Sequence, residues 1–111
     1  MRLSPPTRLL ILAFWSALAF TLVMALLPRP PQAPVGDKVQ HMIAFAVLAS
    51  LASHAYYRAS LLKIALCLAG FGASIEVLQS IPVLGRDASA MDLVADCAAI
   101  AVVMAVARLR N

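Results

Sequence analysis

The chain has 111 residues, of which 63% are hydrophobic and 13% are charged, and its formal net charge is +4. Soluble domains are about half apolar and about a quarter charged, so a water-soluble fold of this length could not cover so much apolar surface. The composition excludes an ordinary soluble domain and favours an all-α integral membrane protein with a single domain, residues 1–111. No basic run with interleaved aromatic residues is present, so the expected partner is the lipid bilayer and not a nucleic acid.

The first apolar segment, residues 9–27, follows Arg8 and contains no charged residue. As a helix it spans roughly 28 Å, close to the ~30 Å thickness of the hydrocarbon core of a bilayer. Arg2 and Arg8 would suit the start of a signal peptide. The apolar run is longer than the usual hydrophobic region of such a peptide, and no clean cleavage site follows it. We therefore expect a retained transmembrane helix.

Three further apolar segments predict helices at about residues 39–57, 61–81 and 90–107. The proline-rich connector at residues 28–34 separates the first two helices, because proline cannot continue a helix. The short link at residues 58–60 predicts that the second and third helices are antiparallel neighbours. The expected architecture is a four-helix transmembrane bundle.

Small residues recur on the third predicted helix, at Gly70, Gly72, Ala73 and Ser74. Small side chains let helix backbones approach closely in lipid. We expect all four positions to lie against neighbouring helices.

Lysine and arginine are unevenly distributed between the two sides of the predicted bundle. Six lie near the two termini and the second link: Arg2, Arg8, Arg58, Lys63, Arg108 and Arg110. The other three lie in or near the first and third links: Arg29, Lys38 and Arg86. The positive-inside rule predicts a multi-pass protein with both termini in the cytoplasm.

The acidic residues gather toward the side of the bundle predicted to face outward. They are Asp37, Glu76, Asp87, Asp92 and Asp96. Three pairs of polar residues have helical spacing: Asp37 with His41, Glu76 with Gln79, and Asp92 with Asp96. Residues three or four positions apart share one side of a helix. We expect these sides to turn toward one another, away from lipid, and to form an outward-facing polar pocket.

The residues of this pocket divide into two groups of candidates. The catalytic candidates are His41, Glu76 and Asp92. The substrate-binding candidates are Lys38, Arg86, Gln79, Asp37 and Asp96. Glu76 has the weakest structural explanation, because it lies inside a helix, where an ionisable group is costly in a bilayer. Asp37 and Asp92 also suit helix capping, and Lys38 suits an interfacial lysine.

The predicted pocket holds more acidic than basic groups, since only Lys38 and Arg86 oppose its carboxylates. Such a cluster would hold protons, protonate His41 or bind a cation. A cation held by Asp92, Asp96 and Glu76 is conceivable. The spacing matches no recognised metal signature, so no metal ligands are assigned and no cofactor is specified.

The pattern Asp37-Lys38-x-x-His41-x-x-x-Phe45, then Glu76-x-x-Gln79, Gly85-Arg86 and Asp92-x-x-x-Asp96, resembles the VanZ-like family of small bacterial membrane proteins. The resemblance covers about residues 37–101. It implies a helical bundle in the bacterial cytoplasmic membrane. It also implies a role in the cell envelope, because the family is named after a protein linked to teicoplanin resistance.

The family's polar positions correspond here to Asp37, Lys38, His41, Glu76, Gln79, Arg86 and Asp92. Asp96 departs from the family pattern, which usually has asparagine at this position. The extra carboxylate adds a negative charge to the site and leaves the transfer of any detailed activity open.

Three functions fit these features. The first is an enzyme or binding protein for an anionic lipid or a lipid-linked cell-wall precursor, with Arg86 and Lys38 holding the anionic group and His41 or Glu76 as general base. The second is a structural or regulatory protein that acts through helix–helix partners, including a homo-oligomer. The third is a component of proton- or cation-coupled transport. The residues alone do not decide whether the protein is an enzyme.

Overall fold

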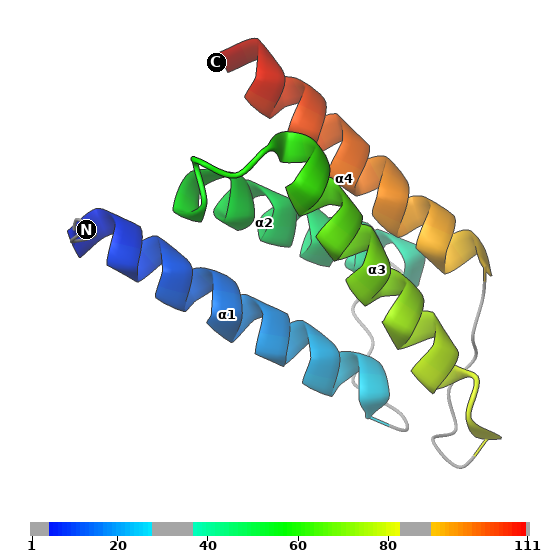
Figure 1. The fold of residues 1–111 in the computed structure, drawn as a ribbon. Helices are drawn as coiled ribbons and strands as arrows, with labels where there is room; N and C mark the ends of the chain where they lie inside the picture. The colour runs from blue at the N-terminus through cyan, green and yellow to red at the C-terminus, as the bar shows by residue number, and fades with distance from the viewer. Residues whose placement is uncertain (1–4, 28–36, 83–89, 111) are drawn as a thin grey trace.

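The computed structural model describes residues 5–27, 37–82 and 90–110. In chain order its helices are α1 (Pro5–Leu26), α2 (Asp37–Ala55), α3 (Leu61–Gln79) and α4 (Ala90–Arg110) (Figure 1). They form a four-helix bundle with principal extents of 45 × 25 × 25 Å. The prediction of an all-α four-helix bundle is therefore confirmed.

The helix ends differ from the predicted ones by a few residues. α1 begins at Pro5 and not at residue 9, because proline is well tolerated in the first turn of a helix. α2 ends at Ala55, and Tyr56 and Tyr57 belong to the following turn. α4 continues to Arg110, beyond the expected end at residue 107.

The link between α2 and α3 ends at a helix cap. Ser60 has an extended backbone, and its hydroxyl accepts a hydrogen bond of 3.1 Å from the backbone N–H of Lys63. Serine at this position satisfies one of the free N–H groups of the first helical turn. α3 therefore starts at Leu61, directly after the short link.

Three of the helices are long and apolar enough to cross a membrane: α1, α3 and α4. The part of α2 whose side chains are described, Val39–Ala55, is apolar but shorter than these three spans. α2 packs most extensively against α4 and α1, so it is the most enclosed helix of the bundle. The molecule is a multi-pass helical membrane protein by the length and composition of these helices.

The two ends of the bundle differ in what they contain. The site end is the end at which α1 and α3 finish and α2 and α4 begin (Figure 1). The turn end is the opposite one, where residues 56–60 connect α2 to α3 and where α1 starts and α4 finishes. The core between them is apolar and contains Phe14, Phe45, Leu48, Ala49, Ala52, Ile64, Leu68, Ile75, Ile100 and Met104.

The small residues of α3 do not all face other helices. Gly72 is buried, and a Cβ atom there would lie 3.2 Å from Asp96 Oδ2 and 3.3 Å from the Phe45 ring. Gly70 has no other atom within 4 Å of the same position, and Ser74 is exposed. The predicted close approach therefore holds at Gly72 and is wrong at Gly70 and Ser74.

Candidate functional site

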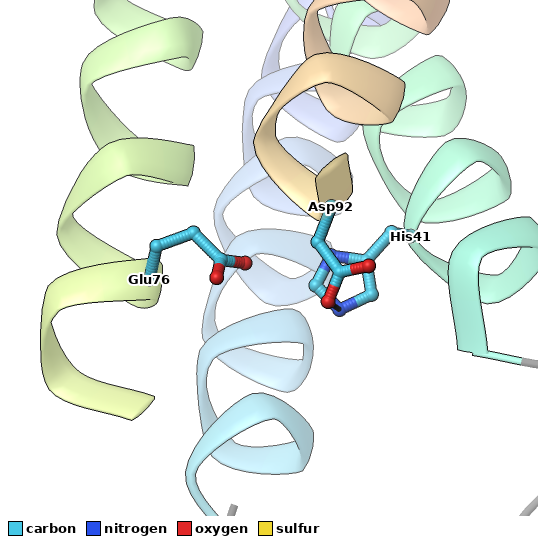
Figure 2. A group of neighbouring side chains, drawn as sticks. All are labelled: His41, Glu76 and Asp92. Atoms are coloured by element: carbon cyan, nitrogen blue, oxygen red, sulfur yellow. Dashed lines mark ion pairs between the residues drawn. The ribbon is translucent and has the colours of Figure 1, made fainter. Parts of the chain in front are cut away.

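Three helices bring their polar residues together at the site end. His41 lies in the second turn of α2, Glu76 in the last turn of α3 and Asp92 in the first turn of α4. Figure 2 shows the Glu76 carboxylate directed from α3 toward the neighbouring His41 and Asp92. A ligand atom of each residue lies within 4.8 Å of a ligand atom of the other two. The fold thus joins the three residues that the sequence marked as catalytic candidates.

His41 lies between two aspartates of α4. Its Nδ1 atom is 3.2 Å from Oδ1 of Asp96, and its Nε2 atom is 4.0 Å from Oδ2 of Asp92. The side chain of Asp96 is 0% exposed, that of Asp92 is 3% exposed and that of His41 is 10% exposed. An ionised carboxylate only accepts hydrogen bonds, so Nδ1 is the donor wherever Asp96 is ionised. In that tautomer a neutral imidazole has its lone pair on Nε2, on the side of Asp92.

Two buried side-chain oxygens at the site end have no hydrogen-bond partner among the described residues. They are Oδ2 of Asp96 and Oε1 of Gln79. Such an atom costs free energy unless water, an ion or a ligand satisfies it. Asp96 Oδ2 lies beside Gly72, which leaves room for the carboxylate where α3 approaches α4.

Gln79 connects the site end to α1. Its Nε2 atom donates a buried hydrogen bond of 2.9 Å to the backbone carbonyl of Ala25. Ala25 lies in the last turn of α1, where the carbonyls have no partner within the helix. One N–H of the Gln79 amide therefore caps a helix, and its oxygen accepts no hydrogen bond from the described residues. Glu76 and Gln79 are three positions apart but contact different parts of the bundle.

The remaining predicted site residues are only partly described. Asp37 and Lys38 begin α2, so their backbones are at the site end. Their side chains lie outside the described residues, and so does the whole of Arg86. Asp92 is in the first turn of α4, as expected for the capping role that the sequence suggested. The binding roles of these residues stay predictions.

Sequence reasoning did not identify two contacts at this end of the molecule. It predicted close packing at Gly72 but not that the neighbour would be the Asp96 carboxylate, and it did not predict that the carbonyl of Ala25 accepts a hydrogen bond from Gln79. A glycine in an apolar helix gives only a general signal of close packing, and a backbone carbonyl gives none. The sequence also assigned no metal ligands, because a histidine and two carboxylates on three separate helices have no characteristic spacing.

The chain has no match among protein-family models, curated proteins or solved structures. Its functional reading therefore rests on its own residues and their arrangement.

Proposed function

We propose that this is a VanZ-like protein of the bacterial cytoplasmic membrane that binds an anionic, lipid-linked molecule of the cell envelope at the outer leaflet. The observation that carries the proposal is the convergence of His41, Glu76 and Asp92 at one end of a membrane bundle. Ionisable groups in membrane helices are rare and mark functional sites. Three ionisable groups meet here from three different helices, so we place the ligand at this end of the bundle.

An anionic ligand suits the helix directions at this end. α2 and α4 both begin there, and the first N–H groups of a helix together with its dipole favour negative charge. Lys38 is the second residue of α2, and Arg86 precedes α4 in the sequence. Arginine binds phosphate or carboxylate through two parallel hydrogen bonds, and lysine adds a point charge. In this proposal these two residues hold the anionic group, and His41 or Glu76 moves a proton.

Transport is a less well supported interpretation of the same residues. Among the described residues, the buried polar ones are Gln79, Asp92 and Asp96, all at the site end. Toward the turn end the bundle is filled by apolar residues such as Leu68 and Met104. Proton or cation transfer needs a chain of polar groups across the membrane, and the described residues of this half contribute no buried polar side chain to one.

The binding test uses the purified full chain and two kinds of vesicle, one with a polyisoprenyl phosphate and one with phosphatidylglycerol. We expect preference for the polyisoprenyl phosphate and a loss of at least about tenfold in affinity for Arg86→Ala and Lys38→Ala, because each removes a charge-assisted contact. Lys63→Ala is the control, since Lys63 is exposed at the turn end. Equal binding of both lipids, or equal loss in the control, would contradict the proposal.

A cellular test addresses the catalytic candidates. Glu76→Gln and His41→Ala should each remove any teicoplanin tolerance that expression of the wild-type chain confers, whereas His54→Ala should retain it. His54 is exposed, and its Nδ1 atom is 2.7 Å from the Ser50 carbonyl of its own helix. Wild-type tolerance in both site variants, with normal amounts in the membrane, would refute the role of the cluster.

A further inference from the structure

The cluster at the site end has the donor set of a transition-metal site. Imidazole and carboxylate groups together bind Zn²⁺ and similar divalent ions, and three protein ligands are the usual number where one coordination position stays open. His41, Glu76 and Asp92 supply one such group each, with ligand atoms within 4.8 Å of one another. We propose that these three residues bind a divalent transition-metal ion of the Zn²⁺ type.

Asp96 positions the histidine for this role. Histidines that bind metals nearly always donate their other ring N–H to a carboxylate or carbonyl, which fixes the tautomer and the ring orientation. Asp96 Oδ1 is 3.2 Å from Nδ1 of His41, so with Nδ1 as the donor the lone pair of Nε2 lies on the side of Asp92. Asp96 is thus a positioning residue, and its extra charge compared with asparagine strengthens the histidine as a ligand.

The electrostatics of the cluster also favour a cation. Glu76, Asp92 and Asp96 bring three carboxylates around one imidazole, and Asp96 is 0% exposed in its side chain. Oδ2 of Asp96 is buried and has no hydrogen-bond partner among the described residues. Carboxylates that converge in a low-dielectric site favour a cation between them. A divalent ion held by His41, Glu76 and Asp92 would be bound by two of the three carboxylates and leave Asp96 to bind the histidine.

The geometry requires only a modest contraction. Ligand atoms around a tetrahedral Zn²⁺ lie about 3.4 Å apart for bonds of about 2.1 Å, so the separations here must shorten by about 1.4 Å at most. Glu76 is only partly buried, and rotation of its flexible side chain can supply this shift while His41 stays against Asp96. The fourth position is then free for water or for an oxygen of an anionic ligand. The metal site goes beyond the proposed function and is tested without any lipid ligand.

The first experiment measures Zn²⁺ binding to the full chain in detergent, purified with a tag that contains no histidine and treated with a chelator. We expect one ion per chain. His41→Ala should weaken binding at least about 100-fold, and Asp96→Asn about 10- to 100-fold because it disturbs the ring that Asp96 orients. His54→Ala is the matched control, since it removes the chain's other histidine, and it should bind as the wild type does.

A second measurement separates loss of the site from loss of the fold. Helix content from circular dichroism is recorded for each variant, and Co²⁺ is bound in place of Zn²⁺. The visible absorption of tetrahedral Co²⁺ should be present in the wild type and in His54→Ala, and absent in Asp92→Asn, a substitution of nearly equal size. The inference fails if the folded wild type binds no metal, or if Asp92→Asn and Asp96→Asn bind it as the wild type does. Lipid binding without metal binding would refute this inference alone, and the reverse result would refute the proposed function alone.

Discussion

The two ends of the bundle are held together by different interactions. At the turn end the core is apolar and contains Ala55, Ile64 and Ala107. A hydrogen bond of 2.7 Å joins Trp15 to the hydroxyl of Tyr56 at its surface. At the site end, one buried polar contact joins α3 to α1, from Gln79 to Ala25, and a partly buried one joins α2 to α4, between His41 and Asp96. The helices gain no hydrophobic free energy from packing against each other in lipid, so polar contacts and close packing must specify the arrangement. The site end therefore fixes how the helices are oriented, and the turn end mainly fills space.

The largest loss of stability is expected for a substitution at Phe45, which lies between the two ends of the bundle. Its side chain is 1% exposed, and its ring is 5.9 Å from that of Phe71. Phe45→Ala should lower the free energy of unfolding by about 3 kcal/mol, because a large cavity loses its van der Waals contacts. The measurement is an SDS titration in mixed micelles followed by circular dichroism. Phe20→Ala is the control, since Phe20 is 66% exposed on α1. An equal loss in both variants would contradict the buried position of Phe45.

A smaller change in stability should distinguish Gly72 from Gly70, the two glycines of α3. Gly72→Leu places a large side chain against Asp96 and Phe45 and should cost about 2 kcal/mol by overpacking. Gly70→Leu makes the same change two residues away, where no other atom lies within 4 Å. It should leave stability unchanged or raise it slightly, because leucine is the better helix former. The same SDS titration measures both variants, and a Gly70→Leu protein as unstable as Gly72→Leu would show that the helix faces are wrongly assigned.

The smallest effect is expected at the turn end. Trp15→Phe removes the donor to the Tyr56 hydroxyl and should cost about 0.5–1 kcal/mol, at the low end for a hydrogen bond because the pair is exposed. A double-mutant cycle with Tyr56→Phe isolates the contact. The double variant should be no less stable than Trp15→Phe alone. Strictly additive losses would mean that the hydrogen bond contributes nothing to stability.

Sequence patterns predicted the helices well and the helix faces poorly. Prolines and uncharged apolar runs define the segments, and the spacing of Asp92 with Asp96 indicated a shared polar side. The inward face of a soluble helix is apolar and its outward face polar, whereas both faces of a membrane helix are apolar. Gly70 and Gly72 are therefore indistinguishable by composition, although only Gly72 meets another helix.

The sequence likewise did not predict which side chains contact one another within the site. The spacing of His41, Asp92 and Asp96 placed the three residues at one end of the bundle. It could not show that Asp96 would be the hydrogen-bond partner of Nδ1 while Asp92 faces Nε2. That choice depends on the rotation and tilt of α4 against α2, which the packing of the whole bundle sets. The binding roles of Lys38 and Arg86 stay predictions, because both side chains lie outside the described residues.

The hydrogen bond from Gln79 to Ala25 has a consequence for how the protein is made. The carbonyl lies on α1, and its donor is the last residue of α3, 54 positions later in the chain. A backbone carbonyl without a partner is costly in hydrocarbon. Until residue 79 has been synthesised, the Ala25 carbonyl therefore depends on another hydrogen-bond donor, such as water at the membrane surface.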